Sequence, residues 1–307
     1  MVLLAVIEIE NLTKYYGKVK ALNKVDLTVD EGEVYGFIGP NGAGKSTTLR
    51  ILLGLLRKNG GEVRLMGKDP WHDAVTLHRD LAYVPGEVNL WPNLTGGEVI
   101  DLVGRLRGGF TPERRAKLIK RFKLDPTKKC GAYSTGNRQK VALIAALVSD
   151  VDLYIFDEPT VGLDPLMEGV FRKCVKELKK AGKTVFLSSH ILAEVEALCD
   201  RVSIIREGKI IETGTFQELR HLTRTSITVD TLKPITGMED MVGVHNLSIE
   251  GNNAHFSVDA EKIDAILKHL TQFGITSLLS TPPTLEELFI RYYGDQYTPL
   301  EEELIQE

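Results

Sequence analysis

The chain has 307 residues, of which 43% are hydrophobic and 26% charged, and a formal net charge of −4 at pH 7. This length predicts about two domains of roughly 100–200 residues each, and the composition is ordinary for a globular protein. The negative charge argues against broad nonspecific binding of nucleic acid, which requires a basic surface. Without a CxxC pair or Cys/His cluster, the cysteines indicate a reducing compartment, with neither a zinc site nor a disulfide framework. They are Cys130, Cys174 and Cys199.

The first ten residues, "MVLLAVIEIE", form an apolar run without a basic start or a small-residue cleavage site. This pattern predicts a β-strand rather than a signal peptide. No stretch of the sequence approaches the ~20 consecutive apolar residues of a membrane span. If the protein works at a membrane, we therefore expect a partner to supply the span.

Apolar strands alternate with helices along the first two thirds of the chain. In the N-terminal part, "VYGFIG" (34–39) predicts a buried strand and "STTLRILLGLL" (46–56) the helix that follows it. Alternation of this kind, with wholly apolar strands, predicts an α/β fold in which helices cover a parallel sheet. Further elements are expected at 96–148 (helical), 152–157 (strand), 166–181 (helix) and 183–190 (strand).

The pattern changes near residues 218–224, which predicts one domain at 1–219 and a second at 220–307. A turn at Gly251-Asn252-Asn253 between apolar residues indicates a hairpin. The order β-α-β-β-α-β plus a helix resembles a ferredoxin-like α+β unit, although the segment after the first strand could equally be a short polar connection. The expected elements are a strand at 225–231, a hairpin at 244–258, a helix at 259–273, a strand at 275–281 and a helix at 283–294.

The segment "GPNGAGKST" (39–47) matches the phosphate-loop pattern G-x-x-x-x-G-K-[ST] between a predicted strand and a predicted helix. Glycines let backbone N–H groups turn toward phosphate oxygens, and the helix N-terminus adds partial positive charge. We expect Lys45 to reach the β- and γ-phosphates and the Ser46 hydroxyl to bind Mg²⁺. The nucleotide-binding candidates are Gly39, Pro40, Asn41, Gly42, Ala43, Gly44, Lys45, Ser46 and Thr47.

The segment "LYIFDEP" (153–159) predicts the second half of the same site. An apolar strand places Asp157 and Glu158 at its carboxyl end, the edge at which α/β sheets bind ligands. We expect Asp157 to hold Mg²⁺ through water and Glu158 to polarise an attacking water.

Phosphate loops serve many classes of NTPase, so the other motifs decide the class. Residues 23–26 spell NKxD, a guanine-reading pattern, but they precede the phosphate loop instead of following it, and we treat them as coincidence. Tyr16 lies upstream, where it could stack on adenine or be an ordinary half-buried strand tyrosine. Downstream follow "YSTGN" (133–137), "GLDP" (162–165) and His190 at the end of a strand.

This order of motifs over residues ~5–219 resembles the nucleotide-binding subunit of ATP-binding cassette (ABC) transporters. The resemblance implies a P-loop NTPase fold with a RecA-like core, an antiparallel β subdomain and a helical subdomain at about 87–148. It also implies that Tyr16 stacks on adenine and that His190 contacts the γ-phosphate and orients water and Glu158. Asp164 lies in the loop that crosses the dimer interface in this family. The signature motif, which contacts the γ-phosphate held by the other subunit, corresponds to Ser134, Gly136 and Asn137.

Two segments depart from the family's usual pattern. "YVPGE" has Gly86 where a magnesium-binding glutamine is usual, and Glu87 follows, whose carboxylate could bind Mg²⁺ instead. "YSTGN" replaces the usual "LSGGQ" of the signature at three positions. We interpret it as a working variant, because Ser134 can cap the following helix and Gly136 keeps backbone access to a phosphate.

The remaining features resemble the drug- and antibiotic-exporter branch, whose membrane partners are of the ABC-2 type. They are "PTLEELFIRYYG" (283–294) and the small C-terminal domain. In the helical subdomain, Leu90, Trp91 and Leu94 either line a groove for the membrane subunit or pack locally. The resemblance implies an ATP-hydrolysing subunit that pairs with a second subunit when ATP binds, and we expect the two subunits to be identical. This pairing would power a separate membrane subunit that exports a drug, antibiotic, lipid or similar amphipathic compound. It implies ATP and Mg²⁺ as cofactors, no nucleic-acid partner, and a location at the cytoplasmic face of the membrane through the membrane subunit.

Two alternatives remain open at this point. A related ATPase could act on DNA or the ribosome, but such chains usually carry tandem cassettes or a long coiled coil, and this sequence has a single loop and no sustained heptads. A regulatory module could bind ATP and hardly hydrolyse it, which the variant signature permits but Glu158 and His190 argue against. Copurification with a multi-span membrane protein would favour export, and bound nucleic acid would favour the first alternative.

Overall fold

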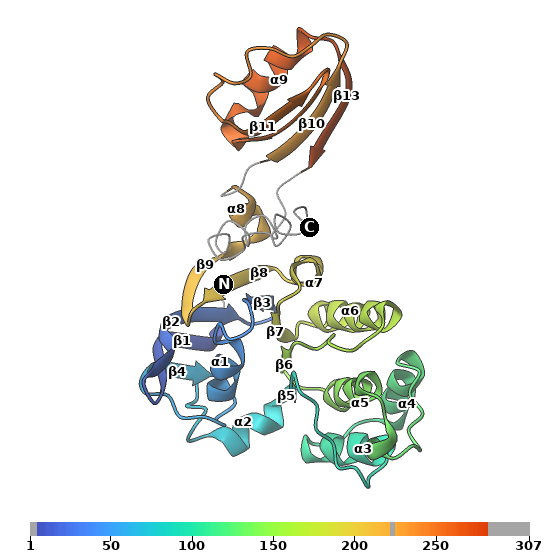
Figure 1. Cartoon of the computed structure of the whole chain (residues 1–307). Coiled ribbons are helices and arrows are strands. Elements are labelled where there is room, and N and C mark those ends of the chain that lie inside the picture. The colour runs from blue at the N-terminus through green and yellow to red at the C-terminus, as the bar shows by residue number, and fades with distance from the viewer. Residues whose placement is uncertain (1–4, 222–224, 282–307) are drawn as a thin grey trace, which may run out of the picture. The chain divides into compact units, whose positions relative to one another are not determined.

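The computed structural model describes residues 5–221 and 225–281. Contacts divide the chain into two compact units, with the division between Gly214 and Thr215, at the end of strand β9 (Lys209–Thr215). Each unit has a sheet and a core of its own (Figure 1). The domain boundary expected after residue 219 stays a prediction.

A six-stranded sheet, in the order β5-β6-β7-β3-β8-β9, forms the centre of the first unit. The pairs β5–β6, β6–β7, β7–β3 and β3–β8 are parallel. Every residue of β3, β6 and β7 is buried, as expected for strands that are covered on both faces. The carboxyl ends of these three strands therefore meet at one edge of the sheet. Besides β9, the strands of this sheet are β3 (Val34–Ile38), β5 (Leu81–Val84), β6 (Leu153–Asp157), β7 (Thr184–Ser189) and β8 (Arg201–Arg206).

The helices expected around the parallel sheet are present. Helix α5 contacts β5, α6 contacts β7, and α7 contacts both β3 and β7. Helix α1 ends at Leu52, four residues before the expected end, and Gly54 follows with a positive φ of 66° that a helix cannot continue. The bounds are α1 (Lys45–Leu52), α2 (Ala74–Asp80), α5 (Thr135–Leu147), α6 (Pro165–Lys180) and α7 (Leu192–Leu198).

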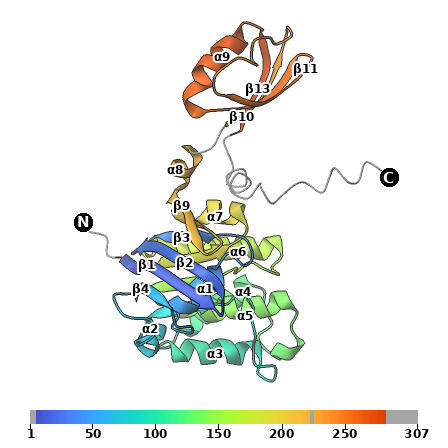
Figure 2. The ribbon, with the colours of Figure 1, turned by 60° about the vertical axis from the view of Figure 1, so that its left-hand side comes forward.

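A second, antiparallel sheet in the order β2-β1-β4 also belongs to the first unit, where β1 and β2 run side by side (Figure 2). In its centre Ile9 pairs with Leu27 on one neighbour and Val63 on the other. These side chains share one buried cluster with Phe37 and Phe186 of the parallel sheet, so the two sheets have a common core. The strands are β1 (Ala5–Tyr16), β2 (Val19–Asp30) and β4 (Gly60–Leu65).

The region 96–148 is helical, as predicted, and consists of α3 (Gly96–Leu106), α4 (Pro112–Arg121), a short 3-10 helix (Cys130–Ala132) and α5. These helices lie together in both views (Figures 1 and 2). Helix α3 begins with a capping box, in which the Thr95 side chain accepts from the Glu98 backbone and the Glu98 side chain accepts from the Thr95 backbone.

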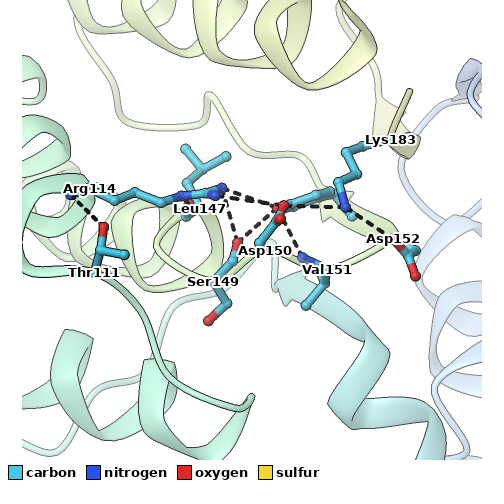
Figure 3. A network of polar contacts seen from close by, with 9 residues as sticks. Thr111, Arg114, Leu147, Ser149, Asp150, Val151, Asp152 and Lys183 are labelled. Carbon is cyan, nitrogen blue, oxygen red and sulfur yellow. Dashed lines mark hydrogen bonds and ion pairs between the residues drawn. The ribbon is translucent and has the colours of Figure 1, made fainter. Parts of the chain in front are cut away.

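Arg114 of α4 ties this helical region to the parallel sheet (Figure 3). Its guanidinium donates to the carbonyl oxygens of Leu147 (2.9 Å) and Ser149 (3.1 Å) at the end of α5. It also lies 3.7 Å from Asp150, which in turn lies 3.3 Å from Lys183, the residue before β7. A planar guanidinium with several donors suits this task of satisfying the last carbonyls of a helix.

The second unit contains a four-stranded antiparallel sheet in the order β11-β12-β10-β13, with α9 (Ile263–Thr271) after β12. Its core includes Ile227, Phe256, Ile266 and Leu270. The strands are β10 (Thr225–Thr231), β11 (Val244–Glu250), β12 (Asn253–Val258) and β13 (Ile275–Thr281), and two short helices, α8 (Phe216–His221) and a 3-10 helix (Ala260–Lys262), complete the described elements.

The helix expected between the first two strands of this ferredoxin-like order is wrong. Residues 232–243 form bends, turns and irregular backbone, and the alternative of a short connection is the one observed. Pro234 and Gly237, whose φ is +77°, disfavour a helix there, while Ile235 and Met238 bury their side chains in the core. The helix expected at 283–294 lies outside the described residues. Within the part of the chain that is described, no helix has the length and apolar character to cross a membrane.

Candidate nucleotide site

The phosphate loop runs from the end of β3 to the first turn of α1. Gly44 precedes the helix with a φ of +114°, a conformation that favours glycine, and a Cβ atom there would lie 2.7 Å from the Leu22 side chain. The loop is therefore compatible with glycine and little else at this position. The N–H groups in the first turn of α1 lack partners within the helix, so they provide donors for an anion at its positive end.

Lys45 lies at the centre of the site, with only 4% of its surface exposed. Its Nζ donates to the carbonyl oxygens of Gly39 (2.6 Å) and Pro40 (3.2 Å) and lies 3.2 Å from Glu158 Oε1. A buried cation requires compensating charge or hydrogen bonds, and these three contacts supply them. Ser46, the next residue, is exposed at the same helix terminus.

Asp157 and Glu158 stand at the carboxyl end of β6, as predicted. Asp157 is 5% exposed and accepts a 2.5 Å hydrogen bond from the Ser188 hydroxyl of β7. Burial, with the negative charge of Asp157, raises the pKa of the nearby Tyr83 to about 12, so this phenol stays neutral. The Glu158 backbone N–H donates to the Ser188 carbonyl at 3.0 Å.

Glu158 adopts a φ of +46°, which is uncommon for a residue other than glycine. This conformation aims a half-buried carboxylate between two partners. Oε1 contacts Lys45, and Oε2 lies 3.3 Å from Nδ1 of His190, which follows β7 and is 43% exposed. The structure thus brings Lys45, Glu158 and His190 into direct contact and adds Asp157 through Ser188, from segments well separated in the sequence.

Ser134, Gly136 and Asn137 lie at the N-terminus of α5. The Ser134 hydroxyl accepts from the Asn137 backbone N–H at 3.4 Å, which is the predicted cap. A Cβ atom at Gly136 would lie 2.4 Å from the Gly162 carbonyl oxygen, so α5 and the "GLDP" loop pack backbone against backbone. Asp164 ends this loop and caps α6, where its Oδ1 accepts from the Met167 N–H at 2.9 Å.

Sequence reasoning missed Gln139, which is 3% exposed on α5 and donates to the Pro159 carbonyl at 2.8 Å. This bond ties the helix that begins at the signature to the residue after Glu158. One signal could have found it: a glutamine that belongs to the buried side of a helix otherwise rich in apolar residues.

Tyr16 and the Gly86-Glu87 pair take no part in these contacts. Tyr16 is 46% exposed at the end of β1, with Lys14 Nζ 5.5 Å from its ring centroid. A Cβ atom at Gly86 would lie 3.4 Å from the Asp157 carbonyl oxygen, an ordinary contact. Glu87 and Leu90 line a hollow of about 540 Å³ that reaches the start of α5.

The comparisons with known proteins agree with this geometry. A family model described as "ABC transporter" matches residues 22–161, and a model of the DrrA1-3-like C-terminal domain of ATP-binding proteins matches 214–293. An uncharacterised ABC transporter ATP-binding protein of Synechocystis sp. is 35% identical over 89% of this chain and 78% of its own length. The chain belongs to the ATP-binding subunits of ABC transporters. The linearmycin-resistance ATP-binding protein of Bacillus subtilis, also in this family, is 32% identical over 94% of this chain and 98% of its own.

The fold of this ABC subunit is also that of solved cassettes. A dimeric cassette in a post-hydrolysis state, bound to ADP and Pi, matches with a TM-score of 0.61 and 26% identity, over 68% of this chain and 98% of the other. The P-loop NTPase fold is therefore confirmed, and so is the expectation of an ATP-binding, ATP-hydrolysing subunit from the drug-resistance branch of ABC transporters. The signature variant "YSTGN" thus occurs in a chain whose family as a whole uses ATP.

Proposed function

We propose that this ATPase works as a pair of identical subunits and powers export of an amphipathic drug, antibiotic or lipid through a separate ABC-2-type membrane subunit. The observation that carries the proposal is the Glu158 carboxylate, held between the buried cation Lys45 and the imidazole of His190. The DrrA-like match of the C-terminal segment and the resemblance to a linearmycin-resistance protein support the export direction.

The residues of the phosphate loop bind and orient the nucleotide. Lys45 and the N–H groups of α1 neutralise the phosphate oxygens, which is the electrostatic part of phosphoryl transfer. Glu158 accepts a hydrogen bond from the attacking water, and His190 holds the carboxylate in position from its other oxygen. Tyr16 offers an exposed ring on which adenine can stack.

The donor set around Asp157 fits Mg²⁺. This ion takes one or two carboxylates together with water and phosphate oxygens in many nucleotide sites. Asp157 has one oxygen engaged by Ser188 and a second on the side of position 86, and the Ser46 hydroxyl is exposed at the helix terminus. Ser46 and Asp157 would hold the ion, with Glu87 as a third oxygen donor. When bound, Mg²⁺ neutralises phosphate charge during transfer.

Pairing of two subunits completes each site. The N-terminus of α5, with Ser134, Gly136 and Asn137, presents N–H donors and a positive dipole end to the γ-phosphate of the facing subunit. Because Gly136 packs against Gly162, the signature moves together with the loop that carries Asp164. ATP thereby favours the closed pair through contacts that ADP lacks, and hydrolysis reverses this preference.

A membrane subunit docks, in this proposal, on the surface near Glu87. Trp91 is 56% exposed beside the hollow that Glu87 and Leu90 line, and an exposed aromatic ring next to a hollow is typical of an interaction surface. The chain would then be held at the cytoplasmic face of the membrane by this partner.

Affinity capture of the tagged chain from detergent-solubilised membranes tests the proposal. We expect a protein of multiple membrane spans to copurify, and Trp91→Glu to reduce its recovery at least fivefold, whereas Val242→Glu, a change at an exposed residue of the second unit, should not. Recovery of nucleic acid or ribosomal protein in place of a membrane protein would contradict it. Cells that carry Lys45→Ala should lose export together with drug tolerance.

A further inference from the structure

A buried carboxylate lies behind the catalytic pair. Glu194 is on α7, four residues after His190, and only 7% of its surface is exposed. Its Oε2 accepts two hydrogen bonds from hydroxyl groups, one from Thr160 at 3.1 Å and one from Ser189 at 3.0 Å. Its Oε1 is buried and has no hydrogen-bond partner among the described residues. Burial of a carboxylate with half of its acceptors unused is costly, so the side chain calls for a functional explanation.

The two hydroxyl groups belong to the two segments that carry the catalytic pair. Thr160 follows Glu158 by two residues, and Ser189 immediately precedes His190. The Ser189 hydroxyl also accepts from the Ile191 N–H at 2.9 Å, so the backbone turn around His190 is bound on both sides. One oxygen atom of Glu194 thereby joins the segment after β6 to the segment after β7.

Resting on the function proposed above, we infer that Glu194 is a positioning residue that sets the separation of Glu158 and His190. Their side chains meet at 3.3 Å, Glu158 Oε2 to His190 Nδ1. Each stands just beyond the end of a strand, Glu158 after β6 and His190 after β7. The shared contact with Glu194 restrains both segments from the interior. A displacement of about 1 Å in such a pair can reduce the rate about 100-fold, because water must be polarised and oriented at once.

Glu194 can accept the hydrogen bonds from Thr160 and Ser189 whether its carboxyl group is protonated or ionised. Burial raises the pKa of Glu194, and the hydrogen bonds from Ser189 and Thr160 oppose the shift. The charged groups that face it are Glu168 and Arg172 of α6, and the thiol of Cys199 lies nearby. With a proton on Oε1, Oε2 still accepts both hydroxyls, because a carbonyl oxygen has two lone pairs.

Steady-state ATPase kinetics of the full chain test the inference. We expect Glu194→Ala to lower kcat by roughly 10- to 100-fold while KM for ATP changes less than about twofold. Glu194→Gln keeps an acceptor oxygen for both hydroxyls, and it should retain at least about a third of kcat. Leu198→Ala is the matched control, since this residue is 5% exposed on the same helix and its apolar side chain cannot hydrogen-bond to either hydroxyl. It should lower Tm and leave kcat per folded molecule unchanged.

Double variants separate a positioning role from a general loss of stability. If Thr160→Val and Glu194→Ala break the same link, the double variant should have the kcat of Glu194→Ala alone. In a His190→Ala background, Glu194→Ala should change kcat less than twofold. Multiplicative losses in both cycles would overturn the inference. Thr160→Val and Ser189→Ala serve as single tests should Glu194→Ala fail to fold.

The imidazole signals of His190 in ¹H–¹⁵N NMR spectra provide a readout that requires no turnover. Glu194→Ala should move them toward those of a solvated histidine, and Glu194→Gln should restore them. Unchanged His190 signals in Glu194→Ala would overturn the inference even if the wild-type chain hydrolyses ATP. Absence of ATP hydrolysis by the wild-type chain and its membrane partner would instead contradict the proposed function, and the NMR comparison would still decide the role of Glu194.

Discussion

The two units of the chain differ in what they bury. The first unit buries Lys45, Asp157, Ser188 and Glu194 close to the carboxyl ends of its parallel strands, and these side chains hydrogen-bond to one another, to neighbouring hydroxyl groups or to nearby backbone. In the second unit, among the described residues 225–281, Thr231 is the buried polar residue, within an otherwise apolar core.

The difference shows how function alters a core. Apolar burial stabilises both units, but buried polar groups stabilise little in net terms and are costly when unpaired. In the first unit this cost falls at the candidate nucleotide site. Substitutions in the second unit should therefore affect its own stability, whereas those in the polar cluster should affect ATP binding and turnover more than stability.

The largest expected effect is on the stability of the second unit. Phe256→Ala removes a fully buried ring from its core and should destabilise that unit by about 3–5 kcal/mol. Affinity for ATP should not change. Calorimetry with and without ATP checks this, since ATP should raise the transition of the first unit alone. An equal fall of both transitions would mean that the two units unfold together.

Lys45→Ala, in the first unit, should lower the affinity for ATP more than it lowers stability. Loss of the buried cation removes charge-assisted hydrogen bonds to phosphate, and affinity for ATP should fall about 100-fold. Lys268→Ala, which removes an exposed ion pair with Asp264 in the second unit, is the control and should leave affinity unaltered. Isothermal titration measures both, and a Lys45→Ala chain with wild-type affinity would remove the assignment of the phosphate loop.

Gly136→Ala should affect pairing and leave binding by a single chain intact. The added Cβ would meet the Gly162 carbonyl oxygen at 2.4 Å and separate α5 from its neighbouring loop, so ATP-driven dimerisation should weaken about tenfold, the size of a 1.4 kcal/mol strain. Gly169→Ala on α6, where a Cβ meets open space, should dimerise normally and gain a little stability. Sedimentation with ATP compares the two, and equal dimerisation would contradict the role of this contact.

The smallest expected effect is a pH dependence. The raised pKa of Glu194 means that the folded chain holds this proton more tightly than the unfolded chain does. The stability that it contributes is therefore present below the unfolded pKa, near the ordinary value of 4.5, and is lost as pH rises through the folded pKa. Glu194→Gln does not titrate, so its stability relative to wild type should increase over that range. Urea unfolding at several pH values measures this, and a constant difference would mean that the pKa is not raised.

The two halves of the candidate nucleotide site could be predicted from the sequence because each depends on local order. Lys45 and Asp157 each follow a strand of apolar residues, and such strands are readable from composition alone. Thr160, Ser189 and Glu194 could not be found in this way, since the bond between Thr160 and Glu194 spans 34 positions and no pattern in the chain marks it.

The local sequence pattern gave one wrong prediction, in the second unit, and several predicted residue roles depend on molecules outside this structure. The prediction of a helix between β10 and β11 was wrong, because Pro234 and Gly237 disfavour a helix there and Ile235 and Met238 are buried without one. The roles of Tyr16, Asn137 and Glu87 stay predictions, because they depend on a nucleotide or a second subunit. Although "YSTGN" differs from the usual signature at three positions, Ser134 still caps α5.

In the proposed function, ATP pairs two chains through the phosphate loop of one and the α5 N-terminus of the other. Analytical ultracentrifugation of Glu158→Gln with ATP and Mg²⁺ tests it most directly. Loss of the carboxylate should stop hydrolysis and leave a stable ATP-bound dimer, which adding Ser134→Arg should convert to ATP-bound monomers. A monomer in Glu158→Gln alone, or an undiminished dimer when Ser134→Arg is added, would mean that ATP does not pair the chains in this way.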